Sequence, residues 1–266
     1  MKKFVLALVA AVFTVSNGVA ATKSYSVAET ANNVESSNYQ VKYGVKLGGV
    51  ASQLQAGGVL ETVSKVIGLD WNTKLGCAAG IFAEVPLANN FAIQPEVLYV
   101  QKGARPSVNA KTAGYALAID LNTPAAVDAL ENLDAHVDLS MDYIEIPILF
   151  KAQLLTPKSK IRPTIFAGPE FSVLVKSQLS VLGGLITYDT KDLVKSTDFG
   201  LVFGVGVEAG KFSVDIRYDL GLTNTFDKSV VSSWLGDFGV SKYDYILDDC
   251  KLKNSAFMAT IGYAFN

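Results

Sequence analysis

Residues 198–222 read DFGLVFGVGVEAGKFSVDIRYDLGL, and apolar and polar side chains alternate along nearly the whole stretch. Apolar residues fall at every second position from Phe199 to Val207 and again from Phe212 to Leu220. The positions between them hold mostly glycine and charged residues. Because successive side chains of a strand point to opposite faces, the stretch predicts two strands, each with a hydrocarbon face and a face of glycine and charge.

The junction between these two strands predicts a tight turn of even length, because the apolar parity changes across it. A Gly210-Lys211 turn suits type II′, whose first central residue is usually glycine, and would set Gly204 opposite Arg217. An Ala209-Gly210 turn would instead set Gly204 opposite Asp215. In both registers glycine leaves room beside a long or charged side chain.

Six further stretches alternate in the same way, which gives eight in all, each about long enough to cross a bilayer as a tilted strand. The connections between the eight alternate between short and long. The six stretches are residues 39–47, 73–85, 91–102, 139–154, 161–175 and 255–265. The short connections are 86–90, 156–160 and the turn at 210, and the long ones run roughly over 51–72, 103–138, 176–196 and 223–254.

Short periplasmic turns and long outer loops are typical of outer-membrane barrels. Backbone groups cannot stay unpaired in hydrocarbon, so a sheet in lipid must close on itself. The sequence therefore predicts an all-β protein, a closed antiparallel transmembrane β-barrel of eight strands whose apolar faces meet lipid. Ten strands are the alternative if residues 107–121 add another pair.

A soluble lipocalin-like barrel or a β-sandwich is the competing interpretation. Such folds bury the apolar face and show the polar face to water. The interior of an eight-stranded barrel cannot hold so many large apolar side chains, and glycine is an unusual residue for a solvent-facing surface.

The N-terminus has the pattern of a signal peptide. Two lysines precede an apolar stretch at residues 4–15, and small residues before Ala20 fit a cleavage site. An uncleaved anchor or a buried helix is the alternative. Export and alternation together predict an integral protein of the cell outer membrane. The predicted domains are a signal peptide at 1–20, a flexible segment at 21–38 and the barrel at 39–266.

Composition limits the chemistry that the chain can perform. The 266 residues carry a formal net charge of −2 and include one histidine and two cysteines. The charge gives no reason to expect a nucleic-acid partner, and the histidine and cysteines form no metal-ligand cluster, so neither metal nor cofactor is expected. Cys77 falls on an apolar strand face, which predicts a buried thiol rather than a disulfide with Cys250.

The inward faces of the predicted strands carry most of the remaining charge. An eight-stranded interior is only wide enough for side chains to fill, and an unpaired charge there would be costly. The charged residues are therefore predicted to form an ion-paired network. Acids outnumber bases among them, so one glutamate is expected to be protonated or to face trapped water. The predicted members are Glu96, Glu145, Lys151, Arg162, Glu170, Glu208, Asp215, Arg217 and Asp219.

The long loops are not purely polar. Residues 57–68 have near-helical apolar spacing, and residues 123–133 add a threonine cap and a proline at the first helical position. Residues 177–189 predict a hairpin about Gly183-Gly184 that extends two barrel strands beyond the membrane. With Trp234 in the last loop, these residues are expected to pack the loops together or to recognise a partner.

Several stretches resemble the Bacteroidetes-type outer-membrane β-barrel family, often called porin-family or PorT-like. They occur in the order of the family and cover nearly all the predicted strands. The resemblance implies a barrel inserted into the outer-membrane bilayer by the barrel-assembly machinery, and implies little about activity. The stretches are YGVKLGGVAS, FAIQPEVLYVQKG, DYIEIPILFKA, FAGPEF, DFGLVFGVGVE and FSVDIRYDLGLTN.

These residues raise three candidate functions. The main hypothesis is a structural or surface-interaction barrel whose outer loops engage a surface or envelope partner. The alternative is a small porin-like channel for ions or small solutes. An enzyme would need a general base, for which His136 between Asp134 and Asp138 is the candidate, but no nucleophile accompanies it. No enzymatic activity is therefore predicted.

Overall fold

The structure of the protein is a computed structural model that describes eight segments of the chain. The signal-peptide prediction with Ala20, the flexible-segment prediction, the helix predicted at 123–133 and the residues Asp134, His136 and Trp234 lie outside these segments. The described segments are residues 40–67, 69–88, 90–108, 137–154, 160–181, 186–191, 194–225 and 250–266.

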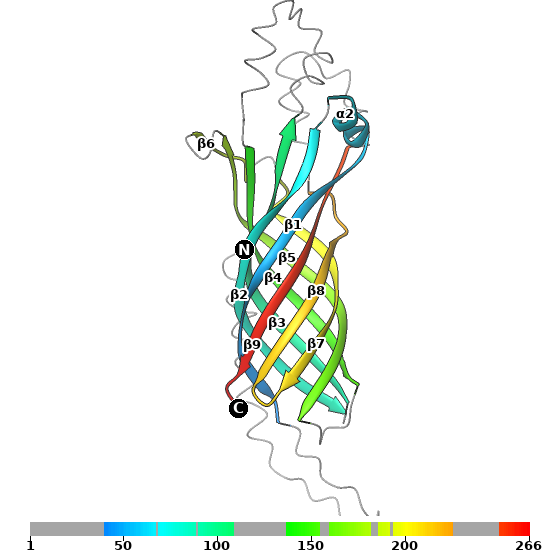
Figure 1. Ribbon diagram of the computed structural model, residues 1–266, viewed down its shortest axis with the longest axis vertical. Helices are drawn as coiled ribbons and strands as arrows, with labels where there is room; N and C mark the ends of the chain where they lie inside the picture. Colours follow the sequence, from blue (N-terminus) through cyan, green and yellow to red (C-terminus); the bar gives the residue numbers. More distant parts are fainter. Residues whose placement is uncertain are drawn as a thin grey trace, which may run out of the picture.

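Eight long strands form a closed antiparallel barrel, which stands upright in Figure 1. Neighbours along the chain pair with each other, and β1 pairs with β9 to close the ring. Because β3 pairs directly with β4, no further pair of strands enters the wall between them, and the eight-strand prediction is confirmed. The wall strands are β1 (Lys42–Gly58), β2 (Leu69–Ala88), β3 (Phe91–Val108), β4 (Val137–Gln153), β5 (Ile161–Val181), β7 (Thr197–Ala209), β8 (Phe212–Gly221) and β9 (Cys250–Ala264).

The turn between β7 and β8 follows the first of the two predicted registers. Ala209 pairs with Phe212, so Gly210-Lys211 is the turn, and Gly204 lies opposite Arg217. Gly210 has a φ of 60°, the left-handed region that two-residue hairpin turns require of their first central residue. The Ala209-Gly210 register is therefore excluded.

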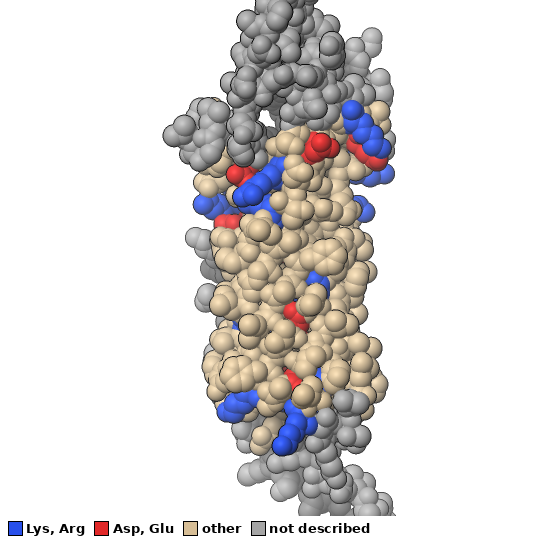
Figure 2. All heavy atoms as spheres, viewed as in Figure 1, with Lys and Arg blue, Asp and Glu red and all other residues tan. Residues whose placement is uncertain are grey.

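The outer face of the barrel is apolar over its middle. Leu47, Leu75 and Ile261 expose 65%, 72% and 61% of their surface, although each belongs to a strand whose other side is buried. Figure 2 shows most charged side chains toward the two ends of this face, with a largely uncharged band between them. A band of large apolar side chains on the outside and charge on the inside is the arrangement of a barrel in lipid, and it contradicts the soluble alternative.

Aromatic side chains gather at the end of the barrel that carries the short turns. The rings of Phe212 and Tyr263 lie 5.1 Å apart, and Phe265 lies within 6.0 Å of both Tyr43 and Tyr263. Aromatic residues favour the membrane–water boundary, so this girdle marks the periplasmic edge of the apolar band.

At the opposite, outer end the strands are longer than predicted. Most of the predicted 51–72 loop is strand, because β1 continues to Gly58 and β2 begins at Leu69. The helix α2 (Val59–Ile67) joins them, as the spacing over 57–68 predicted. Among the described residues, no helix is long and apolar enough to cross a membrane.

The hairpin predicted at 177–189 is present, with one difference. A short strand β6 (Ile186–Asp189) pairs with the outer end of β5, so that Val181 lies opposite Ile186. β6 is separate from β7, however, which begins only at Thr197. The hairpin thus extends one wall strand rather than two.

Cys77 differs from its prediction as a buried thiol. It lies on the outer face of β2, is exposed, and its Sγ donates to Oε1 of Gln101 over 3.1 Å. The alternation placed Cys77 on the apolar face correctly, but that face meets lipid rather than a protein core.

Candidate functional site in the barrel lumen

The inward positions of the strands fill the lumen with charged side chains. Alternation places them there, since every outward apolar residue is followed by an inward one. The closed wall brings strands far apart in sequence within reach of one another. Ion pairs therefore cross the lumen and link residues more than a hundred positions apart, as between Glu96 and Arg217.

A first group of charges, the lower network, occupies the periplasmic end. Its two carboxylates each contact more than one cation: Glu84 lies 2.7 Å from Lys42 and 2.8 Å from Lys151. Glu208 contacts Lys151 as well as Arg162, the latter at 3.0 Å. Three cations and two carboxylates leave this network with a surplus of positive charge. Its members are Lys42, Glu84, Lys151, Arg162 and Glu208.

A second group, the central network, lies deeper in the lumen. The Lys46 ammonium lies 2.7 Å from a carboxylate oxygen of Glu96 and 2.6 Å from one of Asp215. The Arg217 guanidinium, 2% exposed, bonds Glu96 at 2.8 Å and approaches Asp219 at 3.4 Å. Its members are Lys46, Glu96, Lys102, Glu145, Glu170, Asp215, Arg217 and Asp219.

Gln94 connects the two networks. Its side-chain carbonyl accepts from Lys151 over 3.0 Å, and its amide donates to Glu96 over 2.6 Å. Gln94 is 2% exposed, so the polar core is continuous across the lumen at this level. A buried polar network of this kind is stabilising only when its members are paired, which these contacts largely achieve.

The outer end of the central network is its most acidic part. Lys102 contacts three carboxylates, Glu145 at 2.6 Å, Asp219 at 3.4 Å and Glu170 at 3.8 Å. These carboxylates can each place one oxygen within 4.8 Å of the others, which makes them the one cluster among the described residues with a geometry that could hold a metal ion. The Lys102 ammonium contacts all three of them.

Glycines on β7 make room for the central network. A Cβ on Gly204 would approach the Arg217 Cβ to 2.8 Å and the Phe166 ring to 2.6 Å. A Cβ on Gly206 would collide with a carboxylate oxygen of Asp215. The glycine that the sequence repeats on the inner face of β7 is therefore required by the charged side chains of β8 opposite it.

Above the central network the lumen is closed by hydrocarbon. Tyr143, Ala104 and Leu174 lie toward the outer end from Glu145, Lys102 and Glu170 on their respective strands. We call this cluster the outer plug. It consists of Leu54, Ala104, Met141, Tyr143 and Leu174, and none of them is more than 3% exposed.

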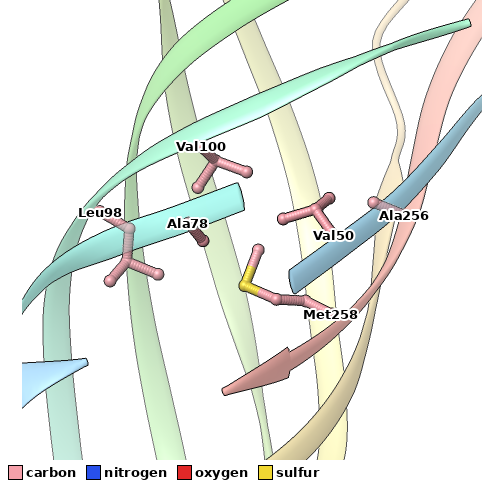
Figure 3. Close-up of a cluster of buried hydrophobic side chains, with 6 residues drawn as sticks. All are labelled: Val50, Ala78, Leu98, Val100, Ala256 and Met258. Carbon is pink, nitrogen blue, oxygen red and sulfur yellow. The ribbon is translucent and has the colours of Figure 1, made fainter. Parts of the chain in front are cut away.

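A second apolar cluster fills the side of the lumen that β1, β2, β3 and β9 form. Figure 3 shows Val50, Leu98 and Met258 pointing toward one another across this space. All six members of the cluster are at most 2% exposed. Together with the outer plug, they fill the lumen with apolar side chains, none of which is more than 3% exposed.

The outer rim carries a smaller group of charges. Asp138 accepts from Nε of Arg105 over 2.8 Å and lies 3.8 Å from Lys74. The enzyme hypothesis placed its candidate general base, His136, beside Asp138. Asp138 is instead engaged by two cations, while its sequence neighbours in that hypothesis lie outside the described residues.

The periplasmic mouth is the open part of the lumen. A small pocket there is lined by residues of the lower network together with Phe82, Lys211 and Phe212. Gln94 and the ion-paired Lys42 and Lys151 line its inner side.

The structure places all nine charged residues that were predicted for the lumen on the inner face of the wall. It divides them into two groups, with Lys151, Arg162 and Glu208 in the lower network and the other six in the central one. Four further members, Lys42, Lys46, Glu84 and Lys102, were not predicted for the network. Each lies on the polar face of a predicted strand, so the alternation alone could have identified them.

A comparison with models of protein families agrees with this architecture. A family model described as outer membrane protein beta-barrel domain matches residues 30–227. No curated protein sequence matches the chain significantly.

Three solved structures illustrate the structural similarity. Ail, the attachment invasion locus protein of Yersinia pestis, is 12% identical with a TM-score of 0.36, covering 85% of this chain and 99% of its own. Neisserial surface protein A is 12% identical with a TM-score of 0.40, covering 84% and 97%. OprG from Pseudomonas aeruginosa is 10% identical with a TM-score of 0.41, covering 85% and 94%.

Proposed function

This chain belongs to the family of outer membrane protein beta-barrel domains, and on that premise we propose that it is a structural or surface-interaction protein that acts through its outer loops. It is an integral protein of the outer membrane, and its apolar band meets the lipid bilayer. The barrel anchors and positions whatever the loops contact. The lumen serves to hold the wall together rather than to carry solutes.

The closed lumen is the observation that carries this proposal. A solute entering from the periplasm would first meet a layer with surplus positive charge and then one with surplus negative charge. Beyond them it would meet the outer plug, in which Met141 and Ala104 are fully buried. An ion of either sign is opposed by one of the two layers, and the buried apolar side chains of the plug oppose ions of both signs.

The outer end of the barrel suits a platform for loops. Gln53 and Gln55 replace the outward apolar residues of β1 there, so the strand continues beyond the apolar band. Helix α2 contacts β1, β2 and β9, and Nε1 of Trp71 donates to the buried Ser64 hydroxyl of this helix over 3.4 Å. The loop between β1 and β2 is thereby fixed to the wall.

Some finer properties belong to the proposal as well. The motifs around Gly48, Glu96 and Glu145 support membership of the PorT-like group of Bacteroidetes-type barrels, with insertion by the barrel-assembly machinery. The N-terminal pattern supports export by a signal peptide cleaved after Ala20. The engagement of Asp138 by Arg105 and Lys74 supports a role without enzymatic activity.

A small channel is the second candidate, and the pocket at the periplasmic mouth favours it. Lys42 is the most accessible charge of the lower network, with 27% of its side chain exposed, so water reaches this level. Conduction would require the ion pairs of Lys42 and Lys151 and the outer plug to open together.

Ionic conductance in a planar lipid bilayer tests the proposal. The purified barrel is refolded, and heat-dependent gel mobility confirms that it has folded. We expect no discrete channel steps. Reproducible steps would contradict the proposal, and a change in their ion selectivity in the Glu145→Gln variant would assign them to the lumen.

The role of the loops is tested separately, in cells that lack the gene. A variant in which a short Gly-Ser linker replaces residues 226–249 should insert and fold but fail to restore the lost phenotype. The Gly49→Ala variant, altered only on the lipid face, is the control and should restore it. Full restoration by the loop variant would show that this loop is not where the barrel acts.

A further inference from the structure

The central network contains more negative than positive groups. Its carboxylates are Glu96, Glu145, Glu170, Asp215 and Asp219, and its cations are Lys46, Lys102 and Arg217. All eight are at most 5% exposed. An uncompensated charge is expensive when it is buried, so a surplus of this kind calls for a further positive group.

The contacts locate the surplus at one carboxylate. Glu96, Asp215 and Glu145 each lie within 2.8 Å of a cation. Asp219 lies 3.4 Å from both Lys102 and Arg217. Glu170 has a single cation contact, to the Lys102 ammonium at 3.8 Å. That ammonium lies closer to Glu145, at 2.6 Å.

The hydrogen bonding of Glu170 gives an independent indication. Its Oε1 accepts a long bond of 3.4 Å from the Ser172 hydroxyl, and its Oε2, although buried, has no hydrogen-bond partner. Both oxygens of the neighbouring Asp219 and Oε2 of Glu145 also lack a donor. Nε and Nη2 of Arg217 are buried donors that also have no hydrogen-bond partner, but the unpaired carboxylate oxygens outnumber them. A protonated carboxyl group would supply one further donor to the cluster.

The other strands around the cluster supply no further charge at this level. On β7, Gly200 lies opposite Glu170, and on β9, Ala256 and Met258 lie opposite Asp219 and Arg217. The titratable and charged groups that face Glu170 at this level are thus Lys102 of β3, Tyr143 and Glu145 of β4, and Arg217 and Asp219 of β8. One inward position further out on β7, the half-buried Asp198 lies opposite Ser172 and accepts from the Thr223 hydroxyl.

We propose that Glu170 is a buried proton-binding site and carries a proton at neutral pH, with its hydroxyl donating to one of the neighbouring carboxylates. In this form the Glu145–Lys102 pair and the Asp219–Arg217 pair keep their contacts while one negative charge of the surplus is removed. A metal ion would serve the same cluster less well, because it would have to displace the Lys102 ammonium from between the carboxylates.

Folding then takes up a proton. An unfolded glutamate releases its proton near pH 4.3, whereas Glu170 in the barrel keeps it at neutral pH. By linkage, this residue lowers the stability of the fold as pH rises above the unfolded titration, until Glu170 ionises in the barrel as well. A glutamine at this position mimics the protonated acid and removes the dependence.

Urea unfolding of the refolded barrel at pH 5, 7 and 9, with EDTA present, tests the proposal. For Glu170→Gln, we expect stability at pH 7 equal to or above wild type. The ratio of folding equilibrium constants, variant over wild type, should rise with pH by up to about tenfold per pH unit. Glu96→Gln is the matched control. It removes a carboxylate held by Lys46 and Arg217, so it should destabilise the barrel at pH 7.

Infrared difference spectra provide a second readout that does not depend on stability. The wild-type spectrum at pH 7 should contain the carbonyl stretch of a protonated carboxyl that is absent from Glu170→Gln and retained in Glu96→Gln. The proposal is overturned if Glu170→Gln lacks this difference, or if it destabilises the barrel at pH 7 as much as Glu96→Gln does. It is equally overturned if Mg²⁺ or Ca²⁺ stabilises wild type but not Glu170→Gln, because the cluster would then hold a metal.

Discussion

Gly204 lies directly opposite Arg217 in the β7–β8 ladder, and the missing side chain of the glycine leaves the space from which the arginine crosses the lumen. The arginine then reaches Glu96 on β3, on another side of the barrel. One glycine on the wall is thus a condition for an ion pair that connects strands far apart in the sequence.

Replacing Gly204 with alanine should therefore destabilise the barrel. The added Cβ would lie 2.5 Å from the Ile216 carbonyl oxygen and 2.6 Å from the Phe166 ring, contacts that only a shift of the strand can relieve. We expect a loss of about 1–3 kcal/mol in the free energy of unfolding, the usual cost of overpacking. Urea unfolding in lipid vesicles measures it.

Gly49→Ala is the control for this substitution. Gly49 lies on the lipid face, and nothing lies within 4 Å of the position that its Cβ would take. Its effect should stay within about 0.5 kcal/mol. Equal losses at the two positions would mean that backbone preference, and not space for the lumen network, explains the glycine at 204.

The Arg217→Met variant should be among the most damaging single changes. It fills a similar volume but leaves Glu96 and Asp219 with fewer partners in a dry interior. Breaking a buried ion pair on one side costs about 3–5 kcal/mol, and we expect a loss of that size or a failure to fold. Heat-dependent gel mobility after refolding distinguishes the two.

Lys65→Met on α2 serves as the comparison for Arg217. Lys65 pairs with Glu61 one helical turn away, but the two side chains are 74% and 50% exposed. An exposed pair of this kind contributes well under about 1 kcal/mol. A large loss at Lys65 and a small one at Arg217 would contradict the view that the lumen holds the fold together.

The wall of this barrel was predictable because a strand in lipid has only two environments. The alternation from Phe199 to Leu220 shows which side chains face lipid and which face the lumen. The parity change at the turn limits the pairing register of the two strands to two choices. Only the structure decided between them, since both Ala209-Gly210 and Gly210-Lys211 satisfy the parity. In the observed register Gly210 is the first central residue of the turn, the position that requires a positive φ.

The membership of the lumen was predictable, and its pairing was not. Alternation states that Glu96 and Arg217 point inward, but the stagger of the closed barrel decides which inward residues meet. The same stagger makes Lys102 rather than Lys151 the partner of Glu145. The outer ends of the strands could not be predicted from the alternation either. Outside the membrane the outward positions, such as Gln53, are no longer apolar.

Because the residues of the outer plug are buried, we expect that water does not reach them in the folded barrel. Met141 is fully buried, and a cysteine at this position, in a chain whose two native cysteines are serine, should resist a water-soluble thiol reagent in the folded barrel. Unfolding in urea should make it reactive. Mass spectrometry after timed labelling reports both states.

Asn72→Cys in the same background is the positive control, because Asn72 is exposed on the outer part of β2. It should react within the time of mixing. If Met141→Cys reacts at a comparable rate, the plug admits water and the channel alternative gains support.

The last residue of the chain should contribute to closure of the barrel. The Asn266 side chain donates to the Val41 carbonyl over 2.7 Å and accepts from the Tyr43 amide over 3.2 Å, which continues the β1–β9 ladder beyond the end of β9. Asn266→Ala loses both bonds, each contributing about 0.5–1.5 kcal/mol, so we expect a loss of about 1–3 kcal/mol in the free energy of unfolding. Gln55→Ala, which removes one bond to Ser255 at the outer end of the same seam, should cost about half as much. Urea unfolding of both variants decides the matter, and a larger loss for Gln55→Ala would place the weak point of closure at the outer end instead.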